Sequence, residues 1–99
     1  MSGTFEWEDR FHPAPGVLFR QLGGETVLLR PDSGWYFGLD VMGTLAWQLL
    51  QEHGRLPPVL EALTREFDVE EQRCREDLER LIGELLENGL LVSETTSPD

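Results

Sequence analysis

The fold of this chain is decided by residues 17–40, which read VLFRQLGGETVLLRPDSGWYFGLD. Residues 17–22, 26–30 and 35–39 are short runs rich in aliphatic and aromatic side chains, a composition typical of β-strands. The segments between them, Gly23-Gly24 and Pro31-Asp32-Ser33-Gly34, are strong turn sequences. The stretch therefore predicts a three-stranded antiparallel β-meander.

Two helical segments are expected directly after the meander. Asp40 precedes residues 41–50, where apolar side chains recur at helical spacing, and its carboxylate is suited to accept backbone N–H bonds from the first turn. Gly54 is expected to end this helix. Pro57 and Pro58 suit the opening turn of a second helix, where a missing N–H is tolerated. The face of the first helix expected to cover the sheet consists of Val41, Leu45 and Leu49.

A third and longer helix is predicted from Glu70 to about Asn88. Asp68 and Glu71 are spaced like a capping box at its start, and Asn88-Gly89 is a typical C-terminal cap. Its apolar stripe consists of Cys74, Leu78, Leu81, Ile82 and Leu85. Residues 90–92 suit a short final strand. The order predicts an α+β fold, compatible with a winged-helix arrangement, in which the β-meander is followed by three helices.

A chain of 99 residues suits one domain, which we expect to span residues 17–92. Residues 1–16 are interpreted as an N-terminal arm, because HPAPG at 12–16 cannot form a regular helix. Residues 93–99 are polar and are expected to form a flexible tail. The arm contains three aromatic residues that either pack back onto the body or bind a partner: Phe5, Trp7 and Phe11.

Charge argues against nucleic-acid binding. The chain has 19 acidic residues, eight Arg and no Lys, which gives a formal net charge of −11. Residues 70–88, the recognition helix of a winged-helix DNA reader, contain three Arg and seven carboxylates and would repel phosphates. The carboxylates are interpreted as a solvated helix face. No apolar run is long enough to cross a membrane, and the first ten residues lack a secretory-signal pattern, so a cytoplasmic location is expected.

The sequence offers no catalytic motif and no cofactor or metal site. Cys74 is the only cysteine, and with His12 and His53 it provides too few ligands for a tetrahedral zinc ion. At an apolar helix position it is interpreted as a small core residue. The chain contains no GxSxG, Gly-rich phosphate loop, HExxH or CxxC pattern. These observations indicate a binding protein rather than an enzyme. Four aromatic residues are open to two interpretations, ligand stacking or ordinary core: Trp35, Tyr36, Phe37 and Trp47.

Residues 33–40, SGWYFGLD, followed by Gly43 and Trp47, resemble the SGxYYxLN…G…W core of the PqqD-like family. Agreement continues over residues 62–69, Asp77-Leu78, Leu81-Ile82, Leu85 and 88–91, so that the likeness runs from about Val17 to Val92. Two positions depart from the family pattern. Trp35 stands where a polar or basic residue is usual, and Asp40 stands where Asn is common, although either residue can cap a helix.

The resemblance implies a RiPP recognition element, a domain that binds the leader of a ribosomally made precursor peptide and presents it to a modifying enzyme. Such enzymes include radical SAM enzymes, leader peptidases and cyclases. In the family the leader lies as an added strand on the third strand, beside the third helix, and an exposed sheet edge is a suitable template for this. The alternative is an adaptor that binds a folded enzyme. The resemblance places the peptide site at Trp35, Tyr36, Phe37, Gly38, Leu39, Arg73, Asp77, Leu78 and Leu81.

Overall fold

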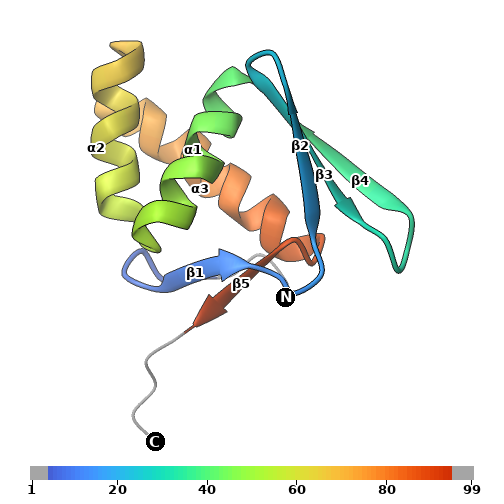
Figure 1. Ribbon diagram of the computed structural model, residues 1–99. Helices are drawn as coiled ribbons and strands as arrows, with labels where there is room; N and C mark the ends of the chain where they lie inside the picture. Colours follow the sequence, from blue (N-terminus) through green and yellow to red (C-terminus); the bar gives the residue numbers. More distant parts are fainter. Residues whose placement is uncertain (1–4, 95–99) are drawn as a thin grey trace, which may run out of the picture.

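The computed structural model describes residues 5–94, which form two antiparallel sheets and three helices (Figure 1). A three-stranded sheet has the order β2-β3-β4, and a two-stranded sheet joins β1 to β5. The expected α+β fold, a three-stranded meander followed by three helices, is confirmed. In chain order the elements are β1 (Arg10–Pro13), β2 (Leu18–Leu22), β3 (Glu25–Arg30), β4 (Trp35–Leu39), α1 (Val41–His53), α2 (Leu56–Phe67), α3 (Glu71–Glu87) and β5 (Leu91–Glu94).

The meander forms where its turn residues predict it. Gly23 and Gly34 adopt φ values of 65° and 72°, a left-handed conformation that favours glycine, and each reverses the chain between adjacent strands. Leu28, at the centre of β3, pairs with Phe19 of β2 and Phe37 of β4. Because directly paired residues share one face of a sheet, this row points toward the helices, and Leu28 is fully buried.

The ends of α1 and the start of α2 also follow local sequence signals. The Asp40 carboxylate accepts a hydrogen bond of 2.8 Å from the Gly43 N–H, as expected of an N-cap. Gly54 is left-handed, with φ 73°, and its N–H donates to the Leu50 carbonyl. Pro57 and Pro58 lie in the first turn of α2. Each of these predictions is confirmed.

The predicted capping box of α3 is wrong. Asp68 ends α2 instead, in a left-handed conformation with φ 53°, and its N–H donates to the Thr64 carbonyl at 3.0 Å. Glu70 stands at the start of α3 and makes no side-chain cap hydrogen bond. Only residues 68–70 separate the two helices, so the residue that could have capped α3 is used to terminate α2.

The buried face of α1 differs from the predicted one. Val41 is 52% exposed, and Leu45 and Leu49 are only half-buried. A Cβ built at Gly43 would lie 3.3 Å from the Leu39 side chain, so the first turn of α1 lies tightly against the end of β4. The helix buries a neighbouring stripe instead. The residues it buries are Gly43, Thr44, Ala46, Trp47 and Leu50.

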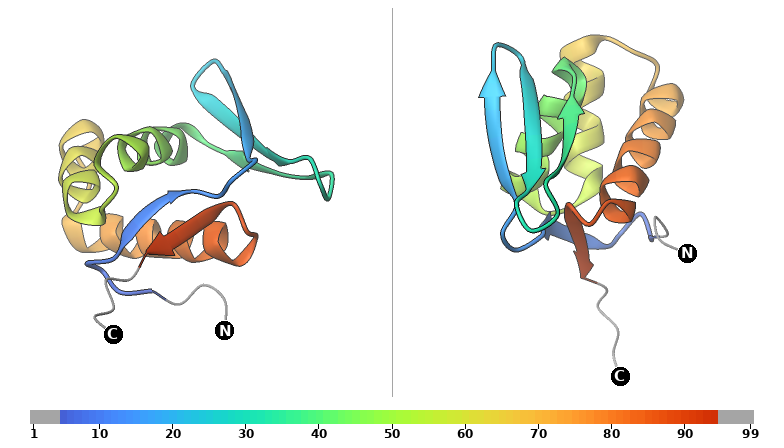
Figure 2. Two further views of the ribbon diagram at one scale, coloured as in Figure 1. Left: turned by 60° about the horizontal axis from the view of Figure 1, so that its bottom comes forward. Right: turned by 90° about the vertical axis from the view of Figure 1, so that its right-hand side faces the viewer.

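The described part of the N-terminal arm packs on the body. β1 pairs with β5 from Arg10↔Glu94 to Pro13↔Leu91, so the two ends of the described chain lie side by side (Figures 1 and 2). Phe11 is buried against the Phe5 ring, and the Arg75 guanidinium lies 4.0 Å from the centre of the Trp7 ring. Packing on the body, one of the two alternatives, is therefore observed. Ser93 and Glu94, expected in the tail, are strand residues, and residues 95–99 lie outside the described part of the chain.

The core lies between the inner face of the three-stranded sheet, the three helices and the small β1–β5 sheet. Trp47 is 2% exposed, and the ring of Phe19 packs edge-on against it at a centroid distance of 6.1 Å. Figure 2 shows the helices gathered on one side of the three-stranded sheet, with the opposite face of the sheet uncovered by any described element. Cys74 is buried in α3, as expected of a core cysteine.

Candidate functional site

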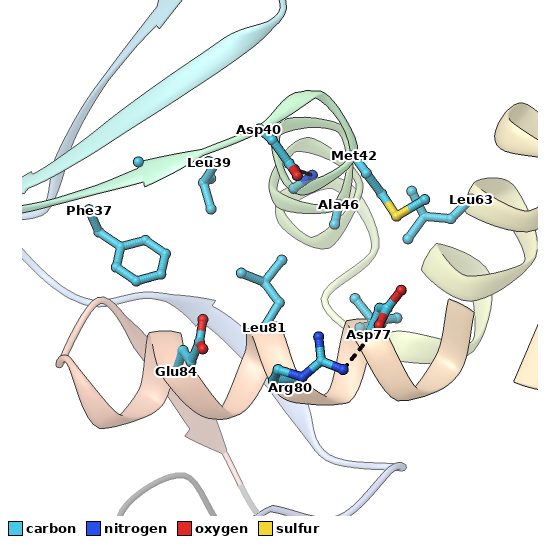
Figure 3. Close-up of a pocket in the computed structure, with 13 residues that line it drawn as sticks. Phe37, Leu39, Asp40, Met42, Ala46, Leu63, Asp77, Arg80, Leu81 and Glu84 are labelled. Carbon is cyan, nitrogen blue, oxygen red and sulfur yellow. Dashed lines mark hydrogen bonds and ion pairs between the residues drawn. The ribbon is translucent and has the colours of Figure 1, made fainter. Parts of the chain in front are cut away.

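A pocket of about 430 Å³ lies between the end of β4, the start of α1 and the side of α3 that faces them (Figure 3). Its base is apolar and its rim is charged. α2 contributes one residue, Leu63. The lining consists of Phe37, Gly38, Leu39, Asp40, Met42, Gly43, Ala46, Leu63, Asp77, Leu78, Arg80, Leu81 and Glu84.

β4 supplies both a wall of the pocket and a free sheet edge. One edge of the strand pairs with β3, and among residues 5–94 no strand pairs with the other. In the right-hand view of Figure 2, β4 lies between β3 and α3, so its free edge faces the helix. Side chains alternate along a strand, and Phe37 and Leu39 point toward α3 while Tyr36 points away. The strand therefore presents unpaired backbone groups beside an apolar pocket.

α3 forms the opposite wall through residues spaced three and four apart. Leu78 is buried and Leu81 is half-buried, and both line the pocket. Asp77 and Arg80 form an ion pair of 3.2 Å at its rim. The Glu84 carboxylate lies one turn further on, near Phe37 and Leu81 (Figure 3). With Asp40, the pocket lining holds three carboxylates and one guanidinium.

The far end of the groove between β4 and α3 is closed by two side chains. The Trp35 indole N–H donates to the Asn88 side-chain oxygen at 3.1 Å, and an Arg30 guanidinium N–H donates to the Gly89 carbonyl at 3.0 Å. Arg30 also pairs with Asp32 at 2.8 Å, and this hydrogen bond holds the pKa of the Asp32 carboxyl below its usual value. These contacts join the second hairpin turn to the end of α3.

Six of the nine residues predicted for the peptide site line the pocket: Phe37, Gly38, Leu39, Asp77, Leu78 and Leu81. Trp35 lies at the closed end of the groove, and Tyr36 points from the opposite face of the sheet. Arg73 is exposed on α3, one turn before Asp77, and does not reach the pocket.

Sequence reasoning did not single out seven lining residues. Arg80 and Glu84 follow Asp77 at helical spacing, and that periodicity was a usable signal. The others depend on how α1 packs against β4 and α2, and α2 against α3, which no local pattern reveals. The residues not predicted for the site are Asp40, Met42, Gly43, Ala46, Leu63, Arg80 and Glu84.

The apolar lining of the pocket and the unpaired edge of β4 beside it suit binding by shape and backbone pairing. Within residues 5–94, no three His, Cys, Asp or Glu side chains are grouped so as to hold a metal ion. Burial, and to a lesser degree the nearby Asp77 carboxylate, raise the pKa of the Cys74 thiol. The thiol is therefore held in its unreactive protonated form.

None of the described helices is both long and apolar enough to cross a membrane.

A family model matches residues 25–91, more than half of the chain. The family is described as coenzyme PQQ synthesis protein D (PqqD), and the chain belongs to it. The family resemblance of the sequence is thereby confirmed. No curated protein sequence matches the chain.

Two solved structures are similar to this chain over most of their length. One is described as TbiB1 in complex with the TbiA(beta) leader peptide, and it has 30% sequence identity and a TM-score of 0.75. The comparison covers 88% of this chain and 98% of that one. The other is a lasso peptide synthetase B1 complexed with the leader peptide, with 30% identity and a TM-score of 0.77 over 84% of this chain and 98% of that one. Both solved structures thus contain the protein in complex with a leader peptide.

Proposed function

We propose that this protein is a RiPP recognition element, which captures the leader segment of a ribosomally made precursor peptide and presents it to a modifying enzyme. The observation that carries the proposal is the free edge of β4 beside an apolar pocket. Two similar structures, both leader-peptide complexes, support it. The proposed binding unit spans residues 17–92.

In the proposed complex the leader adds to β4 as a fourth strand. Backbone groups along the free edge supply sequence-independent hydrogen bonds, and pockets for alternate side chains supply selectivity. An apolar leader side chain would enter the pocket between Phe37, Leu39 and Leu81. A Cβ built at Gly38 meets no atom within 4 Å, so the sheet face beside this position is open.

In this proposal the protein binds the leader, and the partner enzyme carries out the catalysis. Its pocket contains one guanidinium and three carboxylates, but Asp40 caps α1 and Asp77 pairs with Arg80. Asp40, Asp77 and Arg80 are thus held in structural contacts rather than aimed at one reacting atom, which general acid–base chemistry requires. The partner enzyme performs the chemistry on the precursor. Since ribosomes supply the precursor, the cytoplasm is the proposed compartment.

Calorimetric titration with synthetic leader peptides encoded near the gene tests the proposal. We expect one-to-one binding with a dissociation constant at or below about 1 μM, or about −8 kcal/mol. A scrambled peptide of the same composition is the control. Absence of binding by every candidate leader, to protein whose circular dichroism shows it folded, would rule out leader capture.

A further inference from the structure

The exposed hydrophobic side chains of this protein are concentrated on one sheet. Of the eight large hydrophobic residues exposed within residues 5–94, only Val41 and Val69 lie outside the three-stranded sheet. An exposed apolar patch of this kind on a small protein marks an interaction site. The six residues in the sheet are Leu18, Phe19, Leu22, Val27, Trp35 and Tyr36.

Strand pairing assigns four of these six to the face of the sheet that points away from the helices. Leu18 pairs with Leu29, which in turn pairs with Tyr36, so these three form one row across β2, β3 and β4. The next row on this face contains Arg20, Val27 and Gly38, and the third pairs Leu22 with Glu25. We call this surface the outer face. Leu18, Leu22 and Tyr36 are 56%, 62% and 69% exposed on it.

The outer face is electrically neutral on a strongly acidic protein. Residues 17–39 contain two Arg and two carboxylates, whereas the rest of the chain contains six Arg and 17 carboxylates. The net charge of −11 therefore comes entirely from residues outside 17–39. Two copies of the chain would repel one another, which disfavours a second copy as the occupant. A partner with an apolar centre and a basic rim would complement both the patch and its acidic surroundings.

We propose that the outer face docks the modifying enzyme, through an enzyme surface that is apolar at its centre and basic at its rim. This inference rests on the proposed function, because it concerns delivery of a captured leader. The outer face and the pocket lie on different sides of β4: Tyr36 points to the first, and Phe37 and Leu39 to the second. One chain can therefore hold its leader and its enzyme at the same time.

Two matched valine substitutions test the outer face. Val27 and Val69 are each 38% exposed, and only Val27 lies on the outer face, so Val27→Asp and Val69→Asp add the same charge at comparable exposure. The probe is the purified modifying enzyme encoded beside the gene, titrated against the chain saturated with leader. We expect Val27→Asp to weaken enzyme binding at least about tenfold and Val69→Asp to leave it within about twofold.

Leader affinity, measured separately for each variant, separates this inference from the proposed function. Wild-type protein that binds no leader would contradict the proposed function. Leader binding that is retained, with enzyme affinity equal in Val27→Asp and wild type, would overturn the outer-face proposal alone. A wild-type dimer in sedimentation that Val27→Asp converts to a monomer would also overturn it, because a second copy would then be the occupant. If Val27→Asp does not fold, Leu22→Ser, at the end of edge strand β2, replaces it with the same expectations.

Discussion

The two sheets of this protein both contribute to the core but differ in how much of each is covered. The β1–β5 sheet is closed against the body: Phe11 and Leu91 are buried, and the Phe11 N–H donates to the Gly54 carbonyl at 2.9 Å. In the β2–β3–β4 sheet every residue of β2 is exposed, and β4 has a free edge. Both sheets are antiparallel and built from short strands, so the difference lies in what covers them.

This contrast separates stability from binding. Exposed strand edges and apolar sheet faces are surfaces on which other chains can pair and pack, so a sheet that displays both is suited to interaction. The open sheet is attached to the body through its inward-facing side chains, of which Leu28 and Leu39 are buried and Phe19 packs on Trp47. We therefore expect substitutions in the closed sheet to change the free energy of unfolding, and those at the edge of the open sheet to change peptide affinity.

The largest expected effect is on the closed sheet. Phe11→Ala removes a ring that is 3% exposed, and we expect a loss of roughly 3–5 kcal/mol in the free energy of unfolding from the cavity left behind. Urea denaturation measures it. Leader affinity at a temperature where the variant stays folded should remain within about twofold of wild type. A large loss of affinity in folded Phe11→Ala would show that the two sheets are not functionally separate.

Gly38→Pro is the next largest change, and it acts on the open sheet. Proline removes a backbone donor from β4 and stiffens the strand, so leader affinity should fall at least about tenfold. Gly38→Ala is the matched control, because its Cβ would meet open space and its N–H remains. Calorimetry should show near-normal affinity for the alanine variant. Unchanged affinity in a folded proline variant would show that this part of β4 is not the docking edge.

The pocket wall on α3 should make a smaller contribution. Leu81 and Leu86 are both half-buried on α3, but only Leu81 lines the pocket. We expect Leu81→Ala to weaken leader binding by about three- to tenfold, in line with the apolar area removed from the contact, and Leu86→Ala to change it little. Equal effects of the two substitutions on affinity would argue against an apolar leader side chain in this pocket.

The smallest effect is expected at the closed end of the groove. Trp35→Phe keeps an aromatic ring but removes the hydrogen bond to Asn88, an exposed contact worth roughly 0.5 kcal/mol in unfolding free energy. Thermal denaturation of wild type and variant measures this difference. A loss of several kcal/mol would mean that the contact between Trp35 and α3 holds the open sheet in place, rather than merely closing the groove.

Local sequence signals predicted the elements of the open sheet and most of the helix ends. Gly23 and Gly34 require left-handed turns, and Asp40 and Gly54 cap α1 through contacts within four residues, so neighbouring sequence suffices. Asp68 was wrongly predicted to cap α3, because this residue suits either the start of α3 or the end of α2. The short connection between the two helices decides which of them it caps. Local spacing cannot resolve such a competition.

Long-range contacts explain what the sequence did not reveal. β1 has four residues, ends in Pro13, and is a strand only because residues 91–94 pair with it. The pocket shows the same limit: its β4 and α3 residues were predicted from the family resemblance, except Arg80 and Glu84. Met42 and Leu63 reach the pocket only because α1 packs against α2, and α2 against α3. The stripe that α1 buries likewise depends on the elements against which the helix packs, among them α2, β3 and β4.

The central claim, that the leader adds as a strand to β4, is tested most directly by methylating the leader backbone. A series of leader peptides, each with one N-methylated residue, is titrated against the wild-type protein. N-methylation removes one donor at a time, and only alternate residues of an edge strand direct their N–H groups toward the neighbouring strand. We predict that affinity falls at least about tenfold at every second position of the segment that pairs with β4, with smaller changes between. Losses without this alternation, or no loss at any position, would contradict strand addition.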